Sequence, residues 1–200
     1  MSTAESSMLG IWDVTYNKSN TRLENKKLRG VYGDPTTAKL AADWLTSPDI
    51  KTVEDWGCGF GGFENYTKDW QTYIGVDGSK TVAASVIADL VKYTSQADGI
   101  LIRHVLEHNK SWESILKNCL ASFKKRAAIV IFTPLNTQTE ILNTHRNWQN
   151  TGIDIVDISF SWEDLKKIIE QYPDIKYKTK FNILTNTCYK SEHIIYLERN

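Results

Sequence analysis

The chain has 200 residues, with 24 Lys and Arg against 24 Asp and Glu, so its formal net charge is zero. This length predicts a single domain over residues 1–200. The balanced charge gives no basic surface of the kind that binds duplex DNA or membranes. The three cysteines, Cys58, Cys119 and Cys188, lack the spacing of a zinc site or a disulfide framework. The chain shows no export leader and no apolar run near the roughly 18 residues of a membrane span, so we expect a cytoplasmic protein.

The first two thirds of the chain predict an arm, one helix and five strands. The polar start predicts that residues 1–35 form an arm or lid. Asp34 and Pro35 then open a predicted helix in DPTTAKLAADWL, whose apolar residues fall on one side. Five short apolar runs each predict a strand, near residues 51–55, 73–76, 86–87, 99–103 and 127–132. The segments between these runs are long enough for crossover helices, which indicates a parallel sheet.

Two further helices and two strands complete the predicted fold. The stretch SWESILKNCLASF has one apolar helix face, and FSWEDLKKIIEQYP has an N-cap at Ser161 and a stop at Pro173. YKTKFNIL and HIIYLER, joined by NTCYKSE, indicate an antiparallel pair of strands. The predicted class is α/β, a Rossmann-like, seven-stranded, mostly parallel sheet with an antiparallel C-terminal strand pair and helices on both faces.

Three glycines at alternate positions follow the first predicted strand, in VEDWGCGFGGF. Gly57, Gly59 and Gly61 would let the backbone approach a ligand at a turn before a helix N-terminus. The next strand, in YIGVDGS, ends at Asp77, whose carboxylate can accept two hydrogen bonds from ribose hydroxyls. The glycines alone also fit a plain turn. Together with an acid-ended strand they predict a nucleoside site.

Two kinds of nucleoside compete for such a site. The dinucleotide fingerprint places its third glycine three residues after the second, whereas Gly61 comes one residue earlier. Asp55, just before the turn, would repel a pyrophosphate and suit a cationic amino group. The spacing and the acid favour an amino-acid-bearing nucleoside over a nicotinamide dinucleotide.

The segment DWGCGFG, residues 55–61, resembles the first motif of class I S-adenosylmethionine-dependent methyltransferases of the type 11/12 kind. The likeness spans about residues 50–135. With YGDPTT before it and RHVLEHN and FTPL after it, the string is similar to a group of phage and bacterial methyltransferases. The resemblance implies S-adenosyl-L-methionine as cofactor, bound by Asp55, Gly57, Cys58, Gly59, Gly61, Asp77, Gly78, Ser79, Asp89, Arg103 and His104. Asp89 would lie near the adenine, although an acid there also fits a helix cap.

The fourth strand leads into RHVLEHN, residues 103–109, at the predicted cofactor edge. In one interpretation His104 contacts the cofactor while Glu107 and His108 satisfy backbone groups. In a second, His104 or His108 is the catalytic general base. In a third, the string resembles the ExxEH of metal-assisted O-methyltransferases, and His104, Glu107 and His108 bind a divalent metal with His145 from the polar loop NTQTEILNTHRNW. His104 then stands where the first glutamate is expected, which puts magnesium in doubt.

The acceptor is less constrained than the cofactor. The strings that DNA amino-methyltransferases and cytosine-C5 enzymes use after the fourth strand are missing, which disfavours duplex DNA. The acceptor pocket is expected to draw on the arm, with Trp12 and Tyr16 or Tyr32, and on the insert from Thr133 to Phe160. That insert offers polar and aromatic groups, namely His145, Arg146, Trp148, Asp154 and Asp157.

These features support the hypothesis of methyl transfer to an oxygen or nitrogen of a small polar molecule, a sugar or a glycan precursor. Three alternatives stay open. One is metal-assisted O-methylation of a nucleic acid or a diol through His104, Glu107 and His108. The others are a nucleoside-binding subunit without catalysis and a nicotinamide oxidoreductase.

Overall fold

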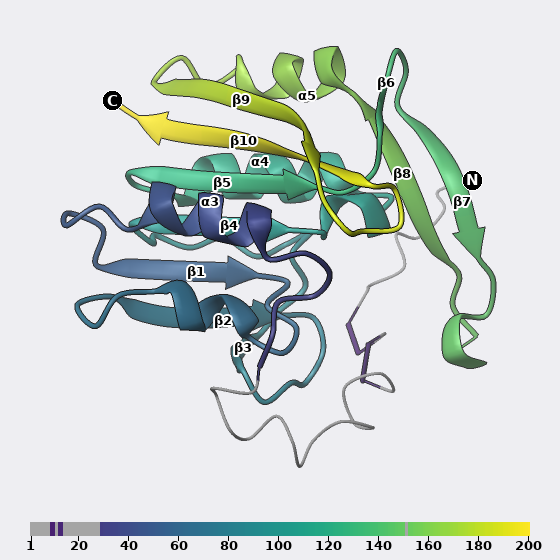
Figure 1. Ribbon diagram of the computed structural model, residues 1–200, viewed down its shortest axis with the longest axis horizontal. Coiled ribbons are helices and arrows are strands. Elements are labelled where there is room, and N and C mark those ends of the chain that lie inside the picture. The colour runs from purple at the N-terminus through teal and green to yellow at the C-terminus, as the bar shows by residue number, and fades with distance from the viewer. Residues whose placement is uncertain (1–8, 11, 14–28, 151) are drawn as a thin grey trace.

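A seven-stranded sheet in the order β3-β2-β1-β4-β5-β10-β9 forms the centre of the chain (Figure 1). The computed structural model describes residues 9–10, 12–13, 29–150 and 152–200, so most of the predicted arm, with Tyr16, lies outside the described residues. The strands are β1 (Thr52–Trp56), β2 (Thr72–Asp77), β3 (Ala84–Ile87), β4 (Gly99–Arg103), β5 (Arg126–Ile131), β9 (Ile175–Leu184) and β10 (Ser191–Arg199). The first five pair in parallel, and β10 runs antiparallel to both β5 and β9. The predicted fold class and the antiparallel C-terminal pair are confirmed.

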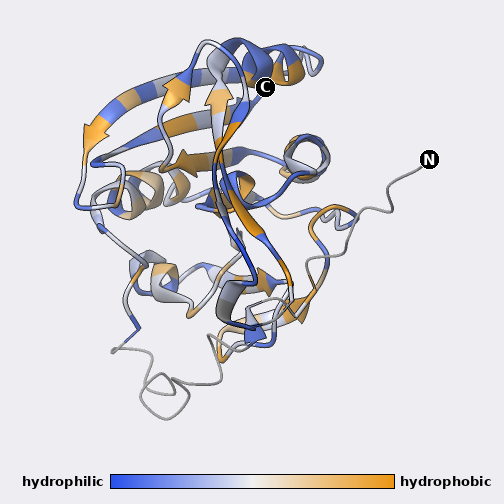
Figure 2. Cartoon of the chain, turned by 90° about the vertical axis from the view of Figure 1, so that its right-hand side faces the viewer, coloured by the Kyte–Doolittle hydropathy of each residue, from blue (hydrophilic) through white to orange (hydrophobic). Residues whose placement is uncertain are grey.

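Helices cover both faces of this sheet because successive strand residues point to opposite sides. Helix α3 (Thr36–Leu45) packs on one face against Leu101 and Val130, while Ile100 and Ile129 belong to the core on the other face. That second core also contains the buried sides of α4 (Trp112–Ser122) and α5 (Trp162–Ile169). Apolar residues line the strands and the inner sides of these helices, with polar residues outside (Figure 2).

The helix ends follow from local sequence. The carboxylate of Asp34 accepts a hydrogen bond from Thr36 N at 2.8 Å and opens α3. Ser161, the N-cap of α5, accepts a hydrogen bond from Asp164 N at 3.4 Å. Both starts agree with the sequence prediction.

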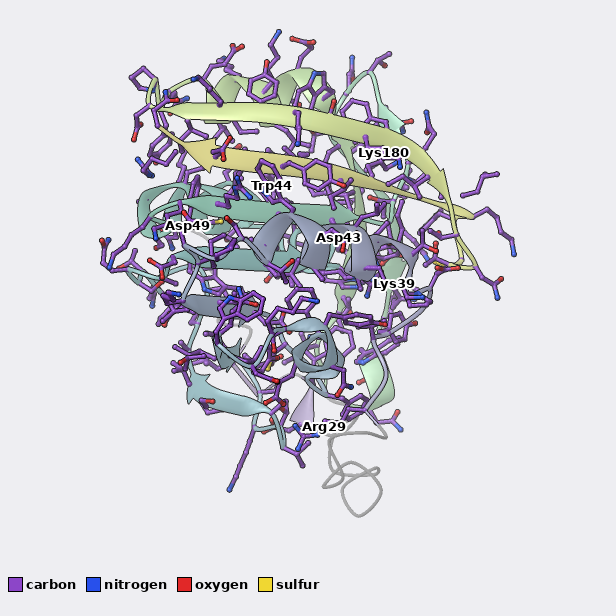
Figure 3. All side chains as sticks on the ribbon, turned by 60° about the vertical axis from the view of Figure 1, so that its left-hand side comes forward. Arg29, Lys39, Asp43, Trp44, Asp49 and Lys180 are labelled. Atoms are coloured by element: carbon purple, nitrogen blue, oxygen red, sulfur yellow. The ribbon has the colours of Figure 1, made fainter. Side chains whose placement is uncertain are left out.

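The outer side of α3 is polar and carries Lys39, Asp43 and Trp44 (Figure 3). Two cations lie over the ring of Trp44, with Arg126 at 4.3 Å and Lys178 at 4.1 Å from its centroid. These contacts tie the helix to β5 and to the edge strand β9.

The prediction of crossover helices between the first four strands is wrong. Residues 57–98, all of them described, contain only the 3-10 helix η2 (Gly62–Tyr66) besides β2 and β3. At Gly61 the φ angle is +71°, and a Cβ atom would lie 2.3 Å from that of Ala83.

The insert after β5 forms a second, three-stranded sheet in the order β6-β8-β7. It contains β6 (Leu135–Asn136), β7 (Glu140–His145), the 3-10 helix η4 (Trp148–Asn150) and β8 (Ile155–Ser161). The prediction of a polar loop over NTQTEILNTHRNW is therefore wrong, because β7 pairs antiparallel with the buried strand β8. This pairing carries the insert alongside the carboxyl end of the main sheet (Figure 1). The prediction of one domain over residues 1–200 stays a prediction.

None of the helices in the described part of the chain has the length and apolar character that crossing a bilayer requires.

Gly61→Ala is expected to lower the free energy of unfolding by about 2–4 kcal/mol, because it adds a steric clash to an unfavourable backbone conformation. Gly152→Ala is the matched control, since Gly152 has a φ of +77° and an added Cβ atom would meet nothing within 4 Å. That control should cost about 1 kcal/mol. Urea unfolding measures both variants, and equal losses would contradict the packing argument.

Candidate active site

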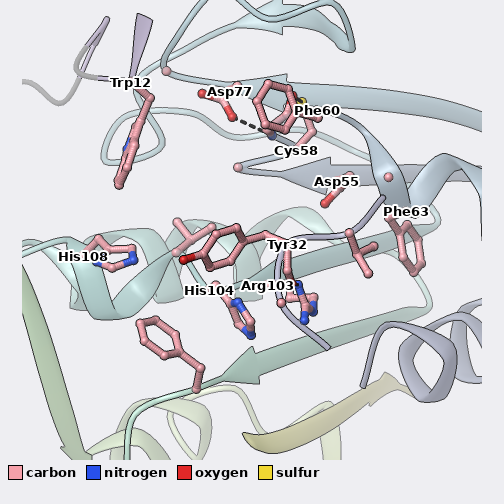
Figure 4. Close-up of a pocket in the computed structure, with 18 of the residues that line it drawn as sticks. Trp12, Tyr32, Asp55, Cys58, Phe60, Phe63, Asp77, Arg103, His104 and His108 are labelled. Atoms are coloured by element: carbon pink, nitrogen blue, oxygen red, sulfur yellow. Dashed lines mark hydrogen bonds between the residues drawn. The ribbon is translucent and has the colours of Figure 1, made fainter. Parts of the chain in front are cut away.

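A cavity of about 820 Å³ opens at the carboxyl ends of β1, β2 and β4 (Figure 4). In open α/β sheets this edge is the usual place for a ligand. The predicted site residues that line it are Asp55, Gly57, Cys58, Gly59, Asp77, Gly78, Asp89, Arg103, His104, His108 and His145. Three others, Gly61, Ser79 and Glu107, do not line the cavity.

The glycine turn is shaped first by contacts within the protein. Gly57 has a φ of +77°, and a Cβ atom there would lie 2.3 Å from Cγ2 of Val105. Gly57 N and Cys58 N both donate hydrogen bonds to Val76 O, at 2.7 and 3.1 Å. Packing between the turn and its neighbours therefore explains Gly57, as it explains Gly61, without any ligand.

Asp77 links the glycine turn to the end of β2. One carboxylate oxygen accepts a hydrogen bond from Gly59 N at 2.9 Å, and the other accepts one from Ser79 N at 2.8 Å. Burial raises the pKa of Asp77 despite these two hydrogen bonds. A carboxylate has about four lone pairs, so Asp77 can still accept a hydrogen bond from a ligand.

Asp55, on the adjacent strand β1, is 4% exposed. It accepts a hydrogen bond from the Tyr73 hydroxyl at 2.8 Å. Burial raises the pKa of Asp55 to about 7, and the nearby charge of Asp77 contributes in the same direction. A carboxylate in this position is stabilised by a cation, and the cavity is the open side from which one can arrive.

Arg103 fastens the start of α3 to the sheet. Its guanidinium group donates hydrogen bonds to Tyr32 O at 2.7 Å and to Asp34 O at 2.9 Å. It also lies 3.4 Å from Glu192, a fully buried carboxylate on β10 that accepts a hydrogen bond from the Thr37 hydroxyl. Sequence reasoning missed Glu192, which is far from Arg103 along the chain.

His104 is a buried imidazole with a backbone φ of +58°, which is rare for any residue with a side chain. Its Nε2 atom lies 3.3 Å from Glu192, but neither ring nitrogen has an aligned hydrogen-bond partner among the described residues. Burial lowers the pKa of His104 to about 4, in spite of the contact with Glu192. At neutral pH the ring is therefore uncharged.

His108 belongs to a different cluster, built on the carboxylate of Asp157 in β8. The Nδ1 atom of His108 lies 3.0 Å from Val156 O and 3.3 Å from Asp157 Oδ1. The other carboxylate oxygen lies 3.1 Å from His145 Nε2 and accepts a hydrogen bond from the Tyr189 hydroxyl at 2.9 Å. Burial alone would lower the pKa of His108, but the contact with Asp157 and the charge of Glu107 raise it.

The four candidate metal ligands do not converge. Glu107 is fully buried and accepts a hydrogen bond from Phe132 N at 2.6 Å. His104 faces Glu192, whereas His108 and His145 contact Asp157. Within residues 9–10, 12–13, 29–150 and 152–200, no group of three or more potential ligands is placed to hold a metal ion.

The described part of the arm reaches across the cavity mouth. Gly10 N donates a hydrogen bond to Gly78 O at 2.8 Å, and Trp12 N donates one to the Ser79 hydroxyl at 2.9 Å. The Trp12 ring packs 5.7 Å from the ring of His108 and 5.5 Å from that of Trp148. The arm thus joins the glycine-turn side of the cavity to the insert.

Asp89 lines the cavity and also shapes the chain after β3. Its carboxylate accepts a hydrogen bond from Val91 N at 3.1 Å. No helix follows Asp89 in the described residues before β4, so the helix cap weighed for this residue is wrong: its carboxylate caps a turn and also faces the cavity.

A family profile described as a methyltransferase domain matches residues 28–183. The chain belongs to this methyltransferase family. A search of curated proteins gave no match.

Several solved structures, two of them of named methyltransferases, share the fold of this chain at low sequence identity. The 1,6-didemethyltoxoflavin-N1-methyltransferase of Burkholderia thailandensis, with S-adenosylhomocysteine bound, has a TM-score of 0.62 and 13% identity, covering 95% of this chain and 87% of its own. Magnesium protoporphyrin IX methyltransferase of Synechocystis, with S-adenosylmethionine bound, has a TM-score of 0.62 and 14% identity, covering 98% and 100%. The N-terminal domain of EvdMO1, crystallised with S-adenosylhomocysteine and D-fucose, has a TM-score of 0.55 and 12% identity, covering 85% and 84%.

Asp55→Asn is expected to change how stability depends on pH. The carboxyl group of an unfolded chain titrates near pH 4, but in the folded chain burial raises the pKa to about 7. Asp55 therefore stabilises the fold below about pH 4 and loses that contribution as the pH rises through 7. Relative to wild type, the variant should gain about 1–3 kcal/mol between pH 5 and pH 8.

Urea unfolding at pH 5 and pH 8 measures this difference. Asp43→Asn, which removes an exposed carboxylate from α3, is the control and should give no such gain. A constant difference between Asp55→Asn and wild type at the two pH values would contradict the raised pKa.

Proposed function

We propose that this methyltransferase transfers a methyl group from S-adenosyl-L-methionine to an oxygen or nitrogen atom of a small polar molecule, a sugar or a glycan precursor. The observation that carries the proposal is the pair of buried carboxylates, Asp55 and Asp77, at the ends of adjacent strands beside one cavity. One needs a cation and the other retains acceptor positions for hydroxyl groups. S-adenosylmethionine offers both features.

The residues around the glycine turn fit this cofactor. Asp55 would hold its ammonium group, Asp77 its ribose hydroxyls, and Asp89 the edge of its adenine. Gly57, Cys58, Gly59 and Gly78 border the same part of the cavity, where absent or small side chains leave room for a ligand. When bound, the cofactor supplies an electrophilic methyl group; the chain's own residues align it, exclude water and manage the acceptor proton.

The acceptor would occupy the other end of the cavity, next to His104 and His108. The walls there include Trp12, Phe132 and Trp148, and polar groups come from His145 and Asp157. Aromatic walls with a few polar groups suit a ring that has one apolar face and hydroxyls at its rim. The D-fucose in the EvdMO1 crystals is in keeping with a sugar acceptor.

Other acceptors and roles receive less support. Net charge is zero, which disfavours duplex DNA. The metal-assisted alternative lacks converging ligands in the part of the chain that the structure describes. A subunit without catalysis would not require two histidines at the acceptor end. The free cysteines Cys58 and Cys119 are buried, in keeping with a reducing cytoplasm as the site of action.

Thermal unfolding with added ligands tests the cofactor assignment. S-adenosylmethionine and S-adenosylhomocysteine are each expected to stabilise the chain by about 2–3 kcal/mol when present at about 100 times the dissociation constant. NAD at the same concentration should give no shift. Asp55→Asn should weaken both stabilising effects at pH 8, because the carboxylate that holds the ammonium group is gone. Stabilisation by NAD alone would support an oxidoreductase instead.

A further inference from the structure

The position of its hydrogen distinguishes His108 from the other histidines of the cavity. Its Nδ1 atom lies 3.0 Å from Val156 O, and a carbonyl oxygen can only accept a hydrogen bond. The neutral ring therefore carries its hydrogen on Nδ1 and a lone pair on Nε2. Within the described residues no hydrogen bond engages Nε2, and the ring lines the cavity beside Trp12 and Phe132.

Asp157 strengthens this arrangement from the next residue of β8. Its Oδ1 atom lies 3.3 Å from His108 Nδ1, and its side chain is 7% exposed. Burial favours protonation of Asp157, but hydrogen bonds from His108, His145 and Tyr189 hold its pKa at about 2. A carboxylate that stays ionised at every working pH stabilises a positive charge on His108.

The pKa values of the two histidines at the acceptor end are shifted in opposite directions. Burial lowers the pKa of His104 to about 4, whereas contact with Asp157 raises that of His108 against the effect of burial. When the surroundings shift the pKa values of two titratable groups apart, the groups are suited to different roles in acid–base chemistry. His104 is suited to stay neutral beside the ligand, and His108 is suited to take up a proton.

Several other titratable groups face His108. Glu107 on the same 3-10 helix adds a favourable charge, and His104 contributes only when protonated. From the insert and the β9–β10 turn, His145 and Tyr189 reach His108 only through the shared carboxylate of Asp157. Asp157 is the one among these titratable groups that touches Nδ1 directly, and together with the Val156 carbonyl it orients the ring.

We propose that Asp157 is a positioning residue that holds His108 with Nε2 toward an acceptor hydroxyl, so that the methyl acceptor is an alcohol or phenol oxygen. The inference rests on the methyltransferase function proposed above. In the transfer, the oxygen forms a bond to the methyl carbon while the sulfur–methyl bond breaks and its electron pair stays on sulfur. The hydroxyl proton moves to His108 Nε2.

This geometry favours oxygen over nitrogen as the acceptor atom. A hydroxyl group must lose its proton as the new bond forms, whereas a neutral amine already presents a lone pair and can shed a proton to water afterwards. A fixed base backed by an ionised carboxylate is therefore useful mainly for a hydroxyl acceptor.

Nitrogen NMR of ¹⁵N-histidine-labelled protein tests the arrangement without any acceptor. In wild type, neutral His108 should carry its hydrogen on Nδ1. Asp157→Asn is expected to lower the pKa of His108 by about one unit or more. Asp154→Asn removes an exposed carboxylate from the same insert and should leave His108 unchanged.

A hydrogen on Nε2 in neutral wild-type His108 would overturn the proposal, and this result does not depend on whether the variant folds. An unchanged His108 pKa in folded Asp157→Asn would overturn it as well. S-adenosylhomocysteine is titrated into the same samples. Absence of binding would count against the proposed function itself, separately from the state of His108.

An activity assay follows S-adenosylhomocysteine release from S-adenosylmethionine with a panel of free sugars and sugar nucleotides. With an acceptor from this panel, His108→Gln should lower kcat about 100-fold or more. Asp157→Asn should lower kcat at least about tenfold and move the acidic limb of the pH profile to lower pH, with KM for the cofactor unchanged. A methylated nitrogen, or rates indifferent to both substitutions, would contradict the proposal; if no sugar is methylated, the NMR result decides.

Discussion

Burial of two carboxylates side by side is the constraint on which the cofactor end of this methyltransferase depends. Asp55 and Asp77 end adjacent parallel strands, and both are 4% exposed. Hydrogen bonds from Gly59 N and Ser79 N stabilise Asp77. The Tyr73 hydroxyl and the charge of Arg103 favour ionisation of Asp55, but burial outweighs them and drives it toward protonation. An isolated buried charge is costly, and a cationic ligand removes that cost. A cation that binds beside Asp55 would therefore stabilise a carboxylate that the free chain leaves uncompensated.

The acceptor end follows the same logic with histidines in place of acids. His104 is buried against Glu192 and Arg103 and stays neutral, while His108 draws on the ionised Asp157. Each histidine takes its partner from a strand distant in sequence, β10 for one and β8 for the other. The insert that carries β8 therefore supplies the carboxylate that contacts His108 as well as part of the cavity wall at the acceptor end.

Local pattern was enough to predict the seven strands, the three helices and the glycine turn, because burial and turn chemistry act over a few residues. It failed where distant segments decide. The polar sequence of β7 does not predict a strand, and the strand depends on pairing with β8. The β1–β2 connection, in which Gly61 packs on Ala83, contains a short 3-10 helix where an α-helix was expected. The ion pair between Arg103 and Glu192 could not be predicted from local sequence, because the two residues are far apart along the chain. Asp157 was predicted only as one of several polar residues in the insert.

Proton release on cofactor binding is the most direct measure of whether Asp55 is protonated in the free chain and ionised in the complex. Calorimetry of S-adenosylmethionine binding at pH 6, in buffers of different ionisation enthalpy, counts the protons exchanged. With a pKa of about 7 in the free chain, Asp55 should release about one proton as the ammonium group binds, and Asp55→Asn should release none. Binding without proton release in wild type, or equal release from both proteins, would contradict the account.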